Sequence, residues 1–219
     1  MSDLLKAREW YNELKVEKTI EALKKNGFEA LYASNKEEAV SRVLDFVAPE
    51  AVVGLGGSVT LRELGLPDKL RGRGHEVADH WEAVRRGATS DEVLEIRRQQ
   101  INSDVFITST NAVTENGELI NIDGGGQRVA AMIFGPKRVV VVAGINKIVS
   151  DLQGGLDRVR NIASPMNARR LNRKTPCVVT GICSDCDSPD RICNATTIIH
   201  KKMGNTDIAI ILVGEKLGY

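Results

Sequence analysis

Apolar residues recur along the chain with two different spacings, and each spacing predicts one type of element. From Leu4 to Leu23 they recur at near-helical spacing among lysines and glutamates, which predicts an amphipathic helix that ends near Asn26 and Gly27. Short apolar runs follow, separated by segments with helical spacing. The expected strands span residues 28–33, 51–55, 75–78, 105–109, 138–143, 178–180 and 207–213, and the expected helices span residues 36–47, 58–64, 90–102, 150–168 and 195–203.

This alternation of strands and helices predicts an α/β fold with an open, mostly parallel sheet flanked by helices. Residues 118–123 and 129–134 break the alternation, because a glycine-rich connection joins them, and we expect an antiparallel hairpin inserted in the sheet. A chain of 219 residues is long enough for one such domain over residues 1–219, and two full domains are not expected. Its distinct segments are the N-terminal helix, residues 1–27, and a cysteine-rich segment, residues 177–193.

The charge and composition of the chain exclude several classes of partner. Thirty basic and 29 acidic residues leave a formal charge of +1, so no overall field attracts nucleic acid or an anionic membrane. Aromatic residues make up only 4% of the chain, which argues against a stacking platform for single-stranded nucleic acid. No apolar run approaches the roughly 20 residues of a membrane span, and the charged N-terminus is typical of a helix rather than of a signal peptide. We therefore expect a cytoplasmic protein whose partner is a small molecule or another protein.

The first candidate site is VGLGGSVT, residues 53–60, which follows an apolar strand and precedes a helix. Backbone amides at such a junction lie beside the positive end of the helix dipole and can bind a phosphate or a carboxylate. The residues expected to do so are Gly54, Gly56, Gly57, Ser58 and Thr60. The spacing matches neither a Walker loop nor the full Rossmann fingerprint, and a tight strand-to-helix turn also favours glycine for conformational reasons alone.

The second candidate site, residues 108–128, follows another strand and is expected at the same edge of the sheet, where open α/β folds bind ligands. Its candidate catalytic groups are Glu115, as nucleophile or base, and Asp123, as a second acid, with Arg128 as a clamp for an anion. The residues expected to orient a ligand are Asn111, Asn121, Gly124, Gly125, Gly126 and Gln127. An alternative remains for Glu115, because the following Asn-Gly pair is typical of hairpin turns and would leave its carboxylate solvated.

The third candidate site is the segment GINK, residues 144–147, at the end of an apolar strand. Lys147 could bind a phosphate or neutralise an oxyanion as a compact charge at the carboxyl end of the strand, with Asn146 beside it. The alternative is a solvated lysine after a turn.

The fourth candidate site contains every cysteine of the chain, and Cys183 and Cys186 form a C-x2-C pair. Such clustering in a cysteine-poor cytoplasmic chain favours zinc, another soft metal or an iron-sulfur cluster over disulfides. The expected ligands are Cys183, Cys186 and Cys193, because the intervening Asp-Ser-Pro turn would bring Cys193 back toward the pair. Cys177 begins an apolar run, so it is either a fourth ligand or a buried small side chain.

Three segments carry a resemblance to a known family: GLGGSVTLRELGL, ITSTNAVTENGELINIDGGGQRVAAMIFGPKRVVVVAGINKIV and GICSDCDSPDRICNA. The chain resembles the LUD-domain family, the group that includes the lactate-utilization protein C. That family is similar to the superfamily of ribose-5-phosphate isomerase A (RpiA), glucosamine-phosphate deaminase (NagB) and the coenzyme A transferases, which implies an open α/β sheet with sites at strand ends. VGLGGSVT is similar to the anion loop of those isomerases. Glu115-Asn116-Gly117 resembles the Glu-Asn-Gly of coenzyme A transferases, whose glutamate is the acyl nucleophile.

The resemblance implies a role in the oxidation of lactate to pyruvate, alongside iron-sulfur partner subunits. Because the sequence contains no flavin or nicotinamide fingerprint, a self-sufficient dehydrogenase is not expected. The leading hypothesis is a subunit of a redox system for lactate or related organic acids, which binds a small anionic metabolite and holds an iron-sulfur cluster or zinc. The alternatives are an acyl-transfer enzyme that uses Glu115 and a non-catalytic assembly subunit with structural zinc. The exposed face of the N-terminal helix and the resemblance both favour a homodimer.

Overall fold

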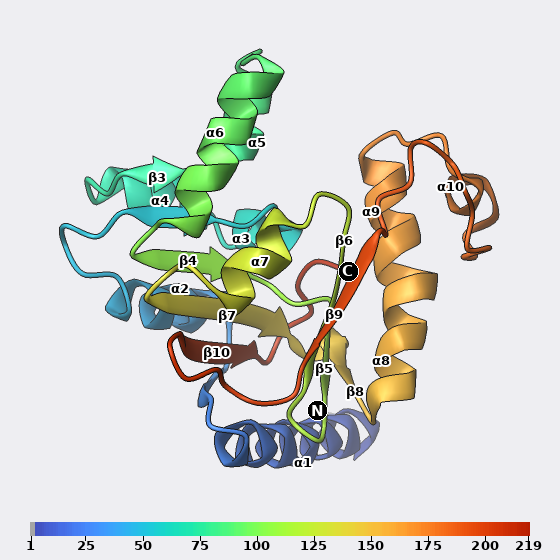
Figure 1. The fold of residues 1–219 in the computed structure, drawn as a ribbon. Helices are drawn as coiled ribbons and strands as arrows, with labels where there is room; N and C mark the ends of the chain where they lie inside the picture. Colours follow the sequence, from blue (N-terminus) through green and yellow to red (C-terminus); the bar gives the residue numbers. More distant parts are fainter. Residues whose placement is uncertain (1–2) are drawn as a thin grey trace.

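A six-stranded parallel sheet forms the centre of the protein, as the computed structural model, which describes residues 3–219, shows (Figure 1). Its strands, in spatial order, are β1 (Glu29–Ala33), β10 (Asp207–Val213), β7 (Arg138–Gly144), β4 (Val105–Thr108), β2 (Val53–Leu55) and β3 (Val77–Ala78). Every pairing between these strands is parallel, so the expected α/β sheet is confirmed. Residues 1 and 2 of the expected N-terminal helix lie outside the described part of the chain.

Helices cover both faces of this sheet. These helices include α1 (Asp3–Lys25), α2 (Lys36–Asp45), α3 (Val59–Glu63), α4 (Leu66–Gly72), α5 (His80–Arg85), α6 (Ser90–Ile101) and α7 (Gln127–Ile133). Val140 and Val142 of β7 belong to one core with residues of α2, α3 and α4. Val139 and Val141 belong to a second core with residues of α1 and α7, because successive side chains of a strand point to opposite faces. An uninterrupted apolar strand such as β7 is typical of a parallel sheet buried on both sides.

A second, four-stranded sheet lies beside the carboxyl ends of the first. Its strands, in spatial order, are β8 (Ile148–Val149), β5 (Ala112–Thr114), β6 (Leu119–Asp123) and β9 (Ala195–Ile199). A nearly continuous helix, built from α8 (Leu152–Arg158), a π-helical turn η2 (Val159–Ala163) and α9 (Ser164–Arg170), packs against this sheet (Figure 1). The sheet and the helix share a small core around Ala112, Ile120 and Val159.

Three predicted elements are wrong. Residues 129–134 do not form the second strand of a hairpin, because Gly126 adopts a φ of +83° and starts α7 there. The antiparallel partners of β6 are β5 and β9 instead, and β9 replaces the helix expected over residues 195–203. Residues 178–180 belong to the short helix α10 (Pro176–Thr180) rather than to a strand, since Pro176 occupies the first helical turn, where proline is favoured.

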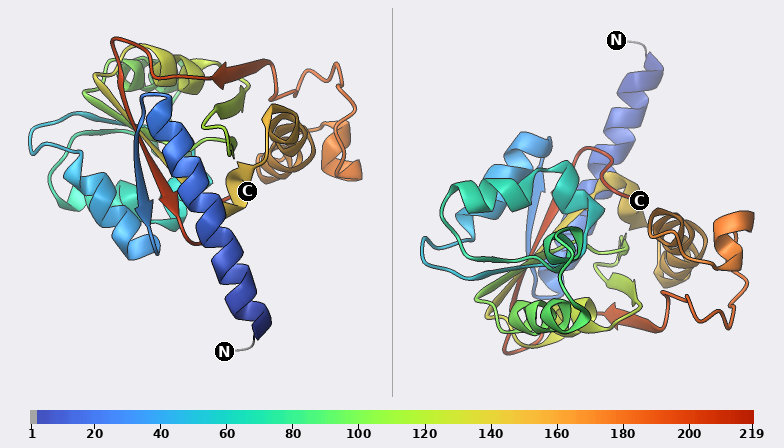
Figure 2. Two further views of the ribbon diagram at one scale, coloured as in Figure 1. Left: turned by 90° about the horizontal axis from the view of Figure 1, so that it is seen from below. Right: turned by 90° about the horizontal axis from the view of Figure 1, so that it is seen from above.

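Helix α1 extends beyond the rest of the protein at its N-terminal end (Figure 2). Its buried residues are Val16, Thr19 and Leu23, whereas Trp10 and Tyr11 are both 60% exposed. The predicted amphipathic helix is present, but only its C-terminal half packs on the sheet. No helix within residues 3–219 is long and apolar enough to cross a membrane.

Candidate functional site

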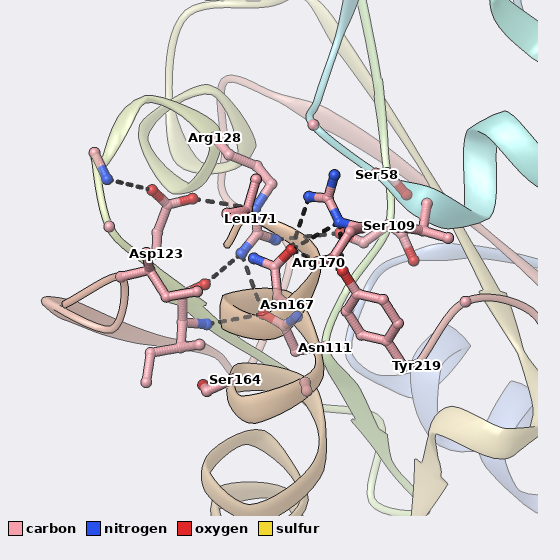
Figure 3. A pocket seen from close by; sticks show the side chains of 18 of the residues that line it. Ser58, Ser109, Asn111, Asp123, Arg128, Ser164, Asn167, Arg170, Leu171 and Tyr219 are labelled. Atoms are coloured by element: carbon pink, nitrogen blue, oxygen red, sulfur yellow. Dashed lines mark hydrogen bonds and ion pairs between the residues drawn. The ribbon is translucent and has the colours of Figure 1, made fainter. Parts of the chain in front are cut away.

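A cleft of about 390 Å³ opens between the carboxyl ends of the parallel strands and helix α9 (Figure 3). Segments that follow β2, β3, β4, β7 and β10 all contribute to its lining. Parallel strands bring their carboxyl ends to one edge of the sheet, and open α/β folds bind ligands at that edge. The remaining walls are the glycine triplet after β6, helix α9 and the loop before β9.

Lys147 is the central charged group of this cleft. It is buried in the short 3-10 turn η1 (Ile145–Lys147) that follows β7, with 4% of its surface exposed. Its Nζ donates hydrogen bonds to Ser109 Oγ at 2.8 Å, Thr60 Oγ1 at 3.0 Å and the Thr110 carbonyl oxygen at 3.2 Å. It forms no ion pair with a carboxylate of residues 3–219. The alternative of a solvated lysine is therefore not what the structure shows.

Burial, with the added positive charges of Arg158 and Arg128, lowers the pKa of Lys147 from 10.5 to about 7. Glu63 opposes this shift. The amine is therefore divided between its protonated and neutral forms near neutral pH. An anion bound beside it would favour the protonated form and raise this pKa.

The loop after β2 brings Gly57, Ser58 and Thr60 to the cleft. Ser58 caps α3 through its side chain, which accepts from the Leu61 amide. Gly57 is needed for close packing, because a β carbon there would overlap Trp81 Nε1 and lie 3.3 Å from His80 Cε1.

The glycine triplet is organised by Asp123. Its Oδ1 accepts hydrogen bonds from the Gly125 amide at 3.0 Å and the Gly126 amide at 2.7 Å, and its Oδ2 accepts from Arg128 Nε at 3.1 Å. Asp123 lines the cleft, and through these three hydrogen bonds its carboxylate fixes the turn formed by the glycine triplet (Figure 3).

Arg128 lies at the junction of the two sheets, and its five N–H donors all have acceptors within the protein. These acceptors are Asp123 Oδ2, Asn121 Oδ1, Asn111 Oδ1 and the carbonyl oxygens of Ser109 and Ile122. Burial lowers the pKa of Arg128, and the charge of Asp123 opposes that shift. Arg128 thus holds the wall of the cleft together and has no spare donor for a ligand.

Helix α9 forms the opposite wall and supplies Arg170, which sequence analysis missed. The guanidinium of Arg170 lies 4.9 Å from the ring centre of Trp81, and its Nε donates to Tyr219 Oη at 2.8 Å and to Asn167 Oδ1 at 3.2 Å. Figure 3 shows Arg170 between Asn167 and Tyr219 on the side of the cleft facing Ser58. These contacts fix the guanidinium plane and leave its Nη1 donors without a protein partner among the described residues.

His80 lies beside Trp81 in the cleft and is neutral at physiological pH. Burial and the neighbouring charge of Arg97 lower its pKa from 6.5 to about 4. Gln100 Nε2 lies 2.9 Å from His80 Nδ1 and also donates to the carbonyl oxygens of Leu55 and Ala78. The ring therefore brings no positive charge to the cleft.

The lining of the cleft is strongly basic. Six basic and two acidic side chains contribute to it, an excess of four positive charges when Lys147 is protonated. The basic residues are Arg97, Arg128, Lys147, Arg170, Arg173 and Arg191, and the acidic residues are Asp123 and Asp190. This excess contrasts with the near-neutral chain as a whole and favours an anionic ligand.

Fifteen residues outside the cysteine segment, apart from Glu115, were expected to bind a ligand or to act as the second acid. The cleft brings ten of them together, and the other five lie in structural positions. Those in the cleft are Gly57, Ser58, Thr60, Asn111, Asp123, Gly124, Gly125, Gln127, Arg128 and Lys147. Asn121 lies behind the wall and accepts from Arg128, and Gly126 starts α7. Gly54 and Gly56 face neighbouring strands and helices, where a β carbon would lie 2.7 Å from Ser103 Oγ and 2.5 Å from Thr108 Oγ1. Asn146 holds the C-terminal segment through three hydrogen bonds to Leu217 and Gly218.

Glu115 does not line the cleft. It lies in the turn between β5 and β6, where its Oε2 accepts from Lys18 Nζ of α1 at 2.8 Å. Gly117, with a φ of +79°, closes this turn by donating to the Thr114 carbonyl oxygen at 2.9 Å. The alternative that Asn116-Gly117 forms a hairpin turn therefore describes this segment, although the carboxylate is paired rather than free in solvent.

The four cysteines line one small cavity of about 20 Å³ next to the cleft, and none of them forms a disulfide. Burial raises the pKa of the Cys193 thiol, as do the three neighbouring cysteines, while Arg191 opposes the shift. Such a volume has room for about one water-sized atom or ion. As arranged, no group of three or more His, Cys, Asp and Glu side chains within residues 3–219 could hold a metal ion. Metal ligation by Cys183, Cys186, Cys193 and Cys177 therefore stays a prediction.

Sequence analysis missed the cleft residues that lie outside the glycine-rich segments. His80 and Trp81 follow the two-residue strand β3, and Arg170 and Arg173 lie at and just beyond the end of α9. The available signal was the basic run ARRLNRK at residues 168–174. This signal is not specific, because arginines at a helix end are also typical of ordinary dipole stabilisation. Tyr219 gave no signal of its own.

Comparison with known proteins identifies a family and a related fold. The model of the LUD domain matches residues 16–213. A solved structure of a DUF162 family protein from Deinococcus radiodurans is similar over 93% of this chain and 98% of that chain, with a TM-score of 0.55 and 12% sequence identity. At that identity the likeness concerns the fold alone. No curated protein matches the chain.

Proposed function

Because the chain belongs to the LUD-domain family, we propose that it binds a small organic anion in the cleft and serves in the utilisation of lactate or related organic acids. The observation that carries this proposal is the basic cleft around Lys147, a buried amine without a carboxylate partner among the described residues. A buried cation of this kind is costly unless an anion compensates it. A carboxylate bound near Lys147 supplies that compensation.

Intrinsic fluorescence provides a direct binding assay, since the chain contains only two tryptophans, and one of them, Trp81, lines the cleft. In a Trp10→Phe protein the emission comes from Trp81 alone. Titration with lactate and with pyruvate is expected to change this emission in a saturable way, and Lys147→Met is expected to weaken the binding at least roughly tenfold. Absence of a saturable response to these acids and to every other small organic anion tested would refute the proposal.

The affinity should also depend on pH with a defined sign. Lys147 is protonated below its pKa of about 7, so an organic anion should bind more weakly as the pH rises through that value. Lys147→Arg keeps its charge over this range and should lose the pH dependence. A pH profile that is the same for wild type and Lys147→Arg would show that another group controls binding.

We further propose that the cysteine segment holds a zinc ion or an iron-sulfur cluster and that the protein is a subunit of a redox system with iron-sulfur partners. The convergence of four free cysteines on one cavity supports metal ligation, and the small volume of that cavity favours a single ion over a cluster. Metal ligation would require the loop at residues 183–193 to close. Anaerobic purification followed by metal analysis and a visible absorption spectrum tests this; a colourless, metal-free protein after reconstitution with both zinc and iron would refute it.

A homodimer is the assembly that we propose for this subunit. The exposed aromatic residues Trp10 and Tyr11 on the projecting half of α1 support it, because a second copy could cover them. Sedimentation analysis should show a dimer for the wild type, and Trp10→Glu with Tyr11→Glu should shift it to a monomer. A monomeric wild-type protein would contradict the proposal.

A further inference from the structure

Four cations of the cleft have no carboxylate partner among residues 3–219. They are Arg97, Lys147, Arg170 and Arg173, which line the cleft but form no ion pair there. The other two are already compensated, since Arg128 is paired with Asp123 at 3.1 Å and Arg191 with Asp185 at 2.7 Å. A structural network of ion pairs would pair such groups with acids. Uncompensated like charges in one cleft instead repel one another until an anion binds.

These cations approach the cleft from different elements. Arg97 belongs to α6, Arg170 and Arg173 belong to the end of α9 and the loop after it, and Lys147 follows β7. Figure 1 shows α6 and α9 on separate sides of the strand ends. A single carboxylate occupies one such position at a time. The arrangement therefore suits a ligand that carries more than one anionic group.

Two of the arginines are arranged so that they can bind an anionic group of a ligand. Arg170 is held in place by Trp81, Asn167 and Tyr219, so little side-chain entropy is lost when a ligand binds it. The Nε of Arg97 is buried and has no hydrogen-bond partner within residues 3–219, a cost that a ligand oxygen would remove. Planar guanidinium groups bind phosphate oxygens in pairs, whereas a lone lysine acts as a point charge.

The volume of the cleft, like its charge, favours a ligand larger than lactate. Lactate has six non-hydrogen atoms, and even at the roughly 30 Å³ that a water molecule takes up in the liquid they fill less than half of the space. The cleft measures about 390 Å³, within the range of sites for larger metabolites. Lactate would also neutralise only one of the four unpaired cations.

We propose that the ligand of this cleft is a phosphorylated organic acid, a metabolite with a carboxylate and at least one phosphate ester, rather than a bare hydroxy acid such as lactate. This inference rests on the proposed binding of an organic anion in the same cleft. The carboxylate binds beside Lys147, Thr60 and Ser109. The phosphate ester binds among Arg97, Arg170 and Arg173.

The test compares five anions by fluorescence titration of the Trp10→Phe protein: lactate, glycerate, inorganic phosphate, 3-phosphoglycerate and citrate. We expect 3-phosphoglycerate to bind at least tenfold more tightly than lactate, glycerate or phosphate, and more tightly than citrate. Its affinity should also fall more steeply with added salt than that of lactate, because more charges are paired. Equal affinities for lactate and 3-phosphoglycerate would overturn the inference and leave the proposed function intact. Tighter binding of citrate would overturn the phosphate ester alone, and failure of every anion would refute the proposed function as well.

Matched variants locate the phosphate. Arg170→Ala and Arg173→Ala should each weaken 3-phosphoglycerate at least fivefold while changing glycerate less than twofold. Arg169→Ala and Lys174→Ala remove neighbouring positive charges outside the cleft lining and should leave both affinities unchanged. Circular dichroism establishes that each variant is folded. If the cleft variants and their neighbours weaken 3-phosphoglycerate equally, only the general charge of this face matters and the assigned phosphate position is wrong.

Discussion

Replacing Lys147 with methionine should make the stability of the protein less dependent on pH. The pKa of this amine is 10.5 in its ordinary state and about 7 in the folded protein. Between those values the unfolded chain binds more protons than the folded one, so the free energy of unfolding rises with pH. Below the folded pKa both states are protonated and the whole burial cost is present, roughly 4 to 5 kcal/mol at 1.36 kcal/mol per pKa unit.

The wild type should therefore gain roughly 2 to 3 kcal/mol over Lys147→Met between about pH 6 and pH 9. Methionine keeps the side-chain volume but loses the three hydrogen bonds to Thr60, Ser109 and Thr110, each worth about 1 kcal/mol. This loss lowers the free energy of unfolding of the variant by the same amount at every pH and does not change its pH dependence. Equilibrium unfolding in urea, in buffers free of phosphate and carboxylates, measures both curves. Lys147→Arg is the matched control, because arginine stays charged throughout and should also lack the rise. Parallel curves for the wild type and both variants would refute the reasoning.

Two further predictions concern Gly57 and Glu115. Gly57→Ala should displace Trp81, shift its fluorescence and weaken anion binding roughly tenfold, because the new β carbon overlaps the indole nitrogen. Gly72→Ala is the control, since its β carbon would lie in open space, and it should change neither the fluorescence nor the binding. Unchanged emission in Gly57→Ala would contradict the packing described. Glu115→Gln should leave anion binding unchanged and lower the free energy of unfolding by less than about 1 kcal/mol, since its partner Lys18 is exposed. The contrary result is a wild-type protein that an acyl-coenzyme A labels in a hydroxylamine-sensitive way, with no labelling of Glu115→Gln. That result would show that Glu115 is a nucleophile.

The main sheet could be predicted because its strands are buried on both faces. Residues 139–143 of β7 are apolar without interruption, and only a strand covered by helices on each side requires that. One of the three errors fell on a segment whose structure depends on a distant partner. Residues 195–199 form a strand because β6 lies beside them, and their own sequence, with two threonines and two isoleucines, suits a strand better than the expected helix.

The candidate site was predictable where glycine and strand ends mark it, and not where a helix supplies the chemistry. Ser58, Asp123 and Lys147 follow separate strands, and the parallel sheet brings them to one edge. Arg170 enters the cleft only because α9 packs across that edge, and no local pattern separates it from Arg169, its neighbour outside the cleft lining. Glu115 shows the opposite case, since a three-residue likeness suggested a nucleophile and the fold places it in a turn against α1.

Two structural guanidinium groups stabilise the walls of this basic cleft. Arg128 joins both sheets through five acceptors, and Arg158 donates to the carbonyl oxygens of Asn146, which lies within η1, and Asn111, which precedes β5. Hydrogen bonds from charged groups contribute about 1.5 to 3 kcal/mol each, which opposes the repulsion that these two side chains add. Both also lower the pKa of Lys147, so the groups that fix the walls of the cleft make its central amine easier to deprotonate. Near neutral pH, where Lys147 is only partly protonated, such a site reaches its full positive charge when a bound anion raises the pKa of this amine.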